Sequence, residues 1–152
     1  MGPIKQAAAL LICACVLGAS APALGAGWHP ALENHLDAVS RQVKSIDMAS
    51  FAQLLEEAAP ITIVDVREYP EYEESHVPGA LNVPRGVVEF KIWDALGDPE
   101  RVSFDTPIYV YCGLGDRSIL AARALQELGF TNVQHVDMRF REWEQSGLPV
   151  DF

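Results

Sequence analysis

The sequence is poor in cysteine and in positive charge. Only three cysteines occur in 152 residues, and two of them, Cys13 and Cys15, lie in an apolar N-terminal run. The chain has 11 Lys and Arg against 21 Asp and Glu, a formal net charge of −10 with His counted as neutral. This charge disfavours nucleic acid and anionic membrane surfaces as partners. It also repels small anions unless a site supplies positive charge of its own.

The sequence also lacks an apolar run that spans a bilayer comfortably, which takes about 20 residues. Its longest run, from Ala7 to Ala19, follows a short segment with one positive charge and precedes small residues. That pattern is typical of a secretory signal peptide over residues 1–26, with cleavage predicted after Ala21 or Ala26. The mature chain would then be periplasmic or secreted, without membrane contact. An uncleaved anchor is the alternative.

Cleavage after Ala26 leaves residues 27–152, which are enough for one domain. Cys112 is the only thiol in that stretch, so no intramolecular disulfide can form. An unpaired thiol in an exported protein is a candidate for reactivity. A buried structural cysteine is the alternative.

Predicted strands alternate with predicted helices along most of the chain. Residues 27–44 form an N-terminal extension, either packed as a helix through Trp28, Leu36 and Val43 or loose. Strands are predicted at 46, 61–66, 80–83, 108–111 and 132–136, and helices after Asp47 and at 70–74, 87–93, 118–128 and 139–145. Strands that are apolar on both faces predict an α/β fold, with a mainly parallel central sheet and helices on both faces.

Sites in such folds form beyond the carboxyl ends of the strands, and Cys112 follows one of these ends. Helix N-termini and neighbouring arginines stabilise the reactive thiolate. Gly113 and Gly115 allow the backbone N–H groups to turn inward as a nest for an anion, and Arg117 can fold back to bind an oxyanion. The loop therefore fits attack on a sulfane sulfur, or on a phosphate or arsenate. A turn that only connects strand to helix is the remaining alternative.

Several motifs, in order, resemble those of a single-domain rhodanese, a sulfurtransferase module, from about Ile46 to Val150. They are Val64-Asp-Val-Arg-Glu68, Ser75-His-Val-Pro-Gly-Ala80, Tyr109-Val-Tyr-Cys112 with the loop that follows it to Ser118, and Gly147-Leu-Pro-Val150. The resemblance implies a rhodanese-like α/β domain over residues 45–152. Two departures are Ser75, where the family usually has Gly, and Asp137-Met138, where a Gly-Gly pair is frequent.

The resemblance also implies a mechanism. Catalytic Cys112 would carry a persulfide, charged by thiosulfate or another persulfide and discharged to cyanide, a thiol or an acceptor protein, with no cofactor beyond the covalent sulfur. Substrate binding would fall to Arg117 and to the loop residues Gly113, Leu114, Gly115, Asp116 and Ser118. The loop spans six residues from Cys112 to Arg117, whereas phosphatases and arsenate reductases of the same fold tend to have one more. The alternatives are a phosphatase or arsenate reductase of this fold, and a non-enzymatic sulfur-carrier or binding module.

The remaining candidates have simpler explanations. Asp65 and Arg67 either orient the loop or tune Cys112 electrostatically, or they form a buried ion pair or turn hydrogen bonds. The ion pair or turn hydrogen bonds are the favoured interpretation. His76 is interpreted as a turn residue, the acidic run 68–74 as a solvated face, and the aromatic residues Phe90, Trp93 and Trp143 as core. No metal is expected, because His29, His35 and His135 lack metal-ligand spacing. Asp116 beside the loop arginine predicts weak thiosulfate affinity.

Overall fold

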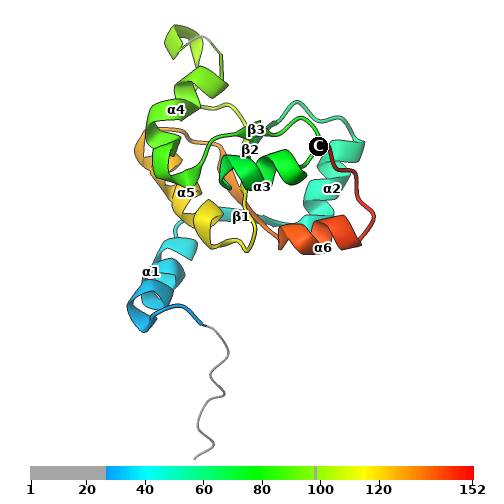
Figure 1. Cartoon of the computed structure of the whole chain (residues 1–152). Coiled ribbons are helices and arrows are strands. Elements are labelled where there is room, and N and C mark those ends of the chain that lie inside the picture. The colour runs from blue at the N-terminus through cyan, green and yellow to red at the C-terminus, as the bar shows by residue number, and fades with distance from the viewer. Residues whose placement is uncertain (1–26, 98) are drawn as a thin grey trace, which may run out of the picture.

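The computed structural model describes residues 27–97 and 99–152, so the predicted signal peptide at 1–26 lies outside the described residues (Figure 1). Within the described part, five parallel strands form one sheet in the order β1-β5-β4-β2-β3. They are β1 (Lys44–Asp47), β2 (Thr62–Asp65), β3 (Leu81–Asn82), β4 (Ile108–Tyr111) and β5 (Val133–Asp137). The chain therefore has the predicted α/β fold with a parallel central sheet.

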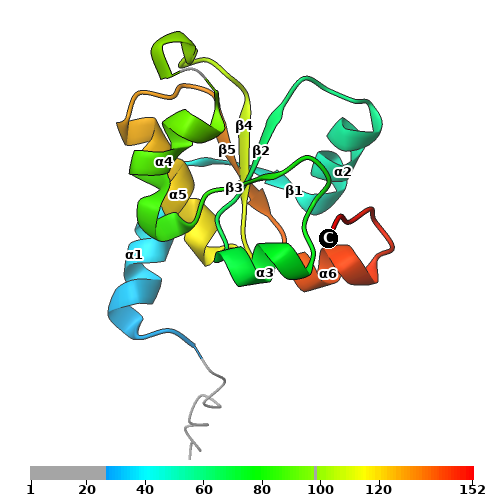
Figure 2. The same ribbon diagram turned by 45° about the horizontal axis from the view of Figure 1, so that its top comes forward.

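Helices cover both faces of this sheet (Figures 1 and 2). The helices α1 (Pro30–Ser40), α4 (Val88–Ala95) and α5 (Asp116–Glu127) gather on one face, and α2 (Met48–Glu56) and α6 (Phe140–Gln145) on the other. The short helix α3 (Tyr69–Glu74) follows β2, and 3-10 turns occur at Arg85–Val87 and Pro99–Arg101. Each face has its own apolar cluster, one around Val110 and Leu125 and the other around Phe51 and Trp143.

The N-terminal extension packs on the domain as a helix. Leu36 and Val39 of α1 are buried, and α1 contacts α5. Strand β1 begins at Lys44, one residue before the predicted start of the domain. No helix among residues 27–97 and 99–152 is long and apolar enough to cross a membrane.

Local signals explain the starts of the helices on either side of the site. Asp47 caps α2, and its Oδ1 accepts from the backbone N–H of Ser50 at 2.9 Å, as predicted. Helix α5 begins at Asp116, two residues before the predicted start, because Gly115 is its N-cap with a φ of 97°. Parallel pairing of β2 with β4 sets Asp65 beside Tyr111, so both strands end at the same edge of the sheet as the loop.

Candidate active site

The sulfur of Cys112 lies at the junction between the buried strand β4 and helix α5. Gly115 adopts a backbone conformation that other residues reach only with strain, and its N–H donates to Cys112 Sγ at 3.1 Å. Cys112 is 1 % exposed and is the free cysteine of the described residues. An N–H donor at the start of a helix is thus directed at the sulfur and stabilises negative charge on it.

A buried hydrogen-bonded pair lies beside the sulfur. Ser118 Oγ is 3.6 Å from Cys112 Sγ and donates to the carbonyl of Gly115 at 2.7 Å. His135 Nδ1 lies 2.9 Å from the same hydroxyl. Because that hydroxyl has one proton and donates it to Gly115, the His135 ring donates from Nδ1. Burial lowers the pKa of His135, which favours the neutral ring.

Segments from the other face of the sheet hold the loop in place. The backbone N–H of Phe140 donates to the carbonyl of Gly113 at 3.1 Å. The guanidinium of Arg67 lies 3.9 Å from the centroid of the Phe140 ring and forms a buried ion pair with Asp65 at 2.6 Å. The favoured interpretation of Asp65 and Arg67 is confirmed. A supporting role of the pair for the loop stays a prediction.

Arg117 is not free to bind an anion. Its two terminal nitrogens donate to the carboxylate of Glu71 on α3 at 2.7 and 2.8 Å. The guanidinium holds the pKa of Glu71 down at about 2, and Glu71 raises the pKa of Arg117. The interpretation of the acidic run 68–74 as only a solvated face is therefore wrong at Glu71, since this carboxylate neutralises the loop arginine.

Asp116 also has a partner, and it comes from the N-terminal extension. The indole N–H of Trp28 donates to Asp116 Oδ2 at 2.5 Å. A hollow of about 180 Å³ beside Cys112 is lined by Trp28, Leu114, Asp116 and Arg117. The structure thus brings together the predicted loop residues, and it adds three residues that the sequence did not single out for the site: Trp28, Glu71 and His135.

The other candidates have structural roles. His76 stacks on Tyr72 at 3.8 Å between ring centroids, and its backbone forms a β-bridge with Asp151, so it lies just before the turn at Pro78 and Gly79 rather than in it. Trp93 and Trp143 pack in apolar clusters, as expected, but Phe90 is 77 % exposed, so its assignment to the core was wrong. Among the described residues, no group of three His, Cys, Asp or Glu side chains could hold a metal ion. The absence of a resident metal stays a prediction.

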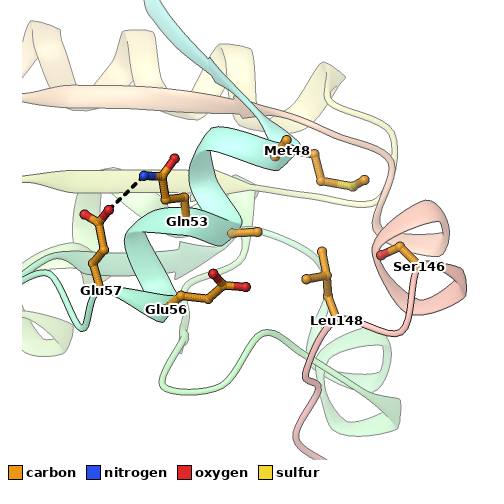
Figure 3. Close-up of a pocket in the computed structure, with 8 residues that line it drawn as sticks. Met48, Gln53, Glu56, Glu57, Ser146 and Leu148 are labelled. Atoms are coloured by element: carbon orange, nitrogen blue, oxygen red, sulfur yellow. Dashed lines mark hydrogen bonds between the residues drawn. The ribbon is translucent and has the colours of Figure 1, made fainter.

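Another hollow lies on the far side of the sheet and has no cysteine in its lining. It measures about 620 Å³ between α2 and the segment after α6, and Figure 3 shows Glu56 and Leu148 among its lining residues. Another residue of this wall, Glu57, accepts a hydrogen bond from Gln53 at 2.8 Å (Figure 3). The small hollow at Cys112 is the candidate active site, because it combines the thiol of Cys112 with an N–H donor aimed at its sulfur.

Comparison with known proteins shows which family the chain resembles. The model of the rhodanese-like domain matches residues 47–146. The thiosulfate sulfurtransferase GlpE of Vibrio cholerae is 30% identical over 101 residues, which cover 66% of this chain and 88% of GlpE. YrkF of Bacillus subtilis, named as a candidate sulfur carrier, is 31% identical over 109 residues, which cover 72% of this chain but only 55% of YrkF.

A solved structure shows the same architecture. It is a Rhodopseudomonas palustris protein of unknown function that is described as a possible tyrosine phosphatase. It has a TM-score of 0.67 and 28% identity, and the match covers 79% of this chain and 93% of that one.

Proposed function

Because this chain belongs to the rhodanese-like domain family, whose model matches residues 47–146, we propose that it is a sulfurtransferase that carries the transferred sulfur on Cys112. Sulfur transfer is the activity of named relatives such as GlpE. One observation carries the proposal: the N–H of Gly115 is aimed at Cys112 Sγ from 3.1 Å, at the edge of a hollow of about 180 Å³. A space of that size suits the terminal sulfur of a small donor.

The reaction balances without an oxidant or a metal. The Cys112 thiolate attacks the outer sulfur of a persulfide donor, RSS⁻. A new S–S bond forms on Cys112 while the S–S bond of the donor breaks, and RS⁻ leaves with the electron pair. A nucleophilic acceptor, cyanide or a thiolate, then attacks the outer sulfur of the Cys112 persulfide, and Cys112 leaves as the thiolate.

Ser118 and Gly115 share the stabilisation of the sulfur. The Gly115 N–H remains aimed at the sulfur in either state. In the thiol form, the S–H of Cys112 points to Ser118 Oγ at 3.6 Å. In the thiolate form, the hydroxyl proton turns from the Gly115 carbonyl to the sulfur. His135 still donates to that oxygen and keeps it in place.

The charges around the loop favour a donor of low charge. Arg117 is already neutralised by Glu71, and Asp116 adds a carboxylate to the wall of the hollow. Thiosulfate carries two negative charges and meets no unpaired cation among these lining residues. The persulfide group of an organic donor carries one negative charge instead of two, so we expect such a donor to be the better one.

A phosphatase of the same fold is the second candidate, since one similar structure is described as a possible tyrosine phosphatase. Phosphoryl transfer needs an arginine that is free to stabilise the anion, whereas Arg117 is held by two hydrogen bonds. Turnover of an aryl phosphate that is unaffected by sulfane donors would favour this alternative.

Mass spectrometry tests the sulfurtransferase directly. The protein is incubated with thiosulfate or with an alkyl persulfide, and we expect a mass increase of one sulfur atom that cyanide removes as thiocyanate. Cys112→Ser should gain no sulfur and have no turnover. The proposal would be overturned if the wild-type protein gained no sulfur atom from any of these donors. A stable persulfide that no small acceptor discharges would instead indicate a carrier that requires a partner protein.

We further propose that the chain is exported and that its N-terminal signal segment is removed by cleavage after Ala21 or Ala26. The support is the pattern of charge, apolar run and small residues in the sequence. The mass of the protein isolated from the periplasm or medium distinguishes cleavage after Ala21 from cleavage after Ala26. A full-length protein that stays with the cell membrane would contradict it.

A further inference from the structure

Trp28 forms part of the wall of the hollow that contains Cys112, although it is 84 positions away in the sequence. Its indole N–H donates to Asp116 Oδ2, and Asp116 is the first residue of α5. The side chain is 53 % exposed, so it is not part of the core of the domain. A large aromatic ring held at the reactive site without a core role suggests contact with a substrate.

The start of helix α1 sets the place of Trp28. His29 is the N-cap, and its Nδ1 accepts from the N–H of Ala31 at 3.2 Å, while Pro30 occupies the first turn. The buried Leu36 and Val39 fix α1 to the domain, and α1 packs on α5. Trp28 is thus positioned from both sides, by the start of α1 and by Asp116.

Trp28 borders a second, outer hollow as well. This hollow is about 470 Å³ and is lined by Gly27, Trp28, Leu114, Asp116 and Arg139. The indole ring and Leu114 therefore line both the space next to the sulfur and the space outside it. Arg139 adds a cation on the outer side, and its nearest carboxylate partner, Glu142, is 3.9 Å away.

The two hollows differ in the chemistry that they offer. In the inner hollow, both charged side chains are occupied, Arg117 by Glu71 and Asp116 by Trp28. The surfaces left for a ligand are the indole ring and the apolar side chain of Leu114. An apolar group of a donor gains from contact with such surfaces, whereas a compact dianion gains nothing from them.

We propose that Trp28 is a specificity-determining residue that selects small organic persulfides over inorganic dianions. The carbon part of the donor lies against Trp28 and Leu114, its outer sulfur faces Cys112, and a carboxylate on the donor is directed to Arg139. The thiolate RS⁻ that leaves after transfer exits through the outer hollow. This inference rests on the proposed sulfurtransferase activity of Cys112.

Steady-state kinetics with two donors tests the inference. Cysteine persulfide and thiosulfate are compared in the wild type, Trp28→Ala and Trp28→Phe, with cyanide as the acceptor. We expect Trp28→Ala to raise the KM for cysteine persulfide about tenfold and that for thiosulfate by less than about threefold. Trp28→Phe keeps an aromatic ring but loses the N–H, so its KM for cysteine persulfide should rise about threefold.

Leu32→Ala is the matched control, because Leu32 is a half-exposed residue of α1 that does not line either hollow. It should leave both KM values unchanged. Equal effects of Trp28→Ala on the two donors, or no effect on either, would overturn the inference. Thermal unfolding of each variant shows whether a change in KM comes from loss of the fold.

Binding without turnover separates this inference from the proposed function. Cysteine, the thiol product, is titrated into Cys112→Ser while tryptophan fluorescence is recorded. We expect cysteine to change the fluorescence of Cys112→Ser but not that of the double variant, which also carries Trp28→Phe. That result supports the role of Trp28 even if no sulfur is transferred. A response that survives in the double variant, or no binding at all, contradicts it.

Discussion

Replacing Glu71 by glutamine should release Arg117 and improve the use of thiosulfate. In the structure the carboxylate accepts two hydrogen bonds from Arg117, and its Oε2 also accepts from the N–H of Glu68 at 3.0 Å. Glutamine keeps an oxygen acceptor for the start of α3 and removes only the negative charge. The variant therefore changes the charge beside the loop without deleting the helix cap.

Coulomb's law gives the order of magnitude of the effect. Glu71 Oε1 lies 3.8 Å from where a β-carbon on Gly113 would be, so the carboxylate is next to the loop. A unit charge about 7 Å from a dianion contributes about 1 kcal/mol at a dielectric constant of about 80. The KM for thiosulfate should therefore fall about fivefold in Glu71→Gln, and less at high salt.

The assay is thiocyanate formation from thiosulfate and cyanide, at low and high ionic strength. Glu73→Gln is the matched control: it removes the same charge from the same helix, and its partner is the hydroxyl of Tyr69 rather than the loop arginine. The unfolding free energy of Glu71→Gln should fall by about 1 kcal/mol, because the lost ion pair is partly exposed. Identical thiosulfate KM values in the two variants would refute the idea that Glu71 limits the use of dianions.

Two further predictions concern the loop and its response to acid. Gly115→Ala should destabilise the protein by about 1–2 kcal/mol and slow sulfur transfer, because φ is 97° there. Gly79→Ala is the control: its φ is 75°, but it lies away from the loop. It should lower the unfolding free energy in urea by a similar amount without slowing transfer. Acid should destabilise the wild type in two windows. Burial lowers the pKa of His135 from 6.5, so protonation of His135 lowers the unfolding free energy as the pH falls below about 6.5. The pKa of Glu71 is lowered from 4.5 to about 2, so its contribution to the unfolding free energy is lost as the pH falls between those two values. Urea unfolding across pH should therefore show the first loss disappear in His135→Gln and the second in Glu71→Gln; losses that persist in these variants would contradict the assignment.

Much of the fold could be predicted from the sequence, because the local signals agree with the final structure. The strand at 108–111 is apolar throughout and is fully buried as β4, and Asp47 caps α2 as its place before an apolar helix predicted. The position of Cys112, directly after a predicted strand and before Gly113 and Gly115, also made its place in the fold predictable. The start of α5 was misplaced by two residues because a glycine N-cap at positive φ gives no side-chain signal.

The partners of the loop could not be predicted, because they depend on contacts between distant segments. Glu71 lies on a helix that precedes Arg117 by 46 positions, and a row of acids in the sequence does not reveal which one turns inward. His135 was judged only by metal spacing. A polar residue in an otherwise buried strand could have drawn attention to it. Trp28, two residues before a proline that starts a helix, was assigned to packing rather than to the site.

Asp116 combines two roles that substitution can separate. As a charge it repels dianions, and as an acceptor it holds the indole of Trp28. Asp116→Asn removes the charge and keeps an oxygen acceptor, so we expect a lower KM for thiosulfate and an unchanged KM for cysteine persulfide. Asp116→Ala removes the acceptor as well and should also raise the KM for cysteine persulfide, as Trp28→Ala does. If both variants lower the thiosulfate KM and neither affects cysteine persulfide, Asp116 acts by charge alone, and the indole does not need it as an anchor.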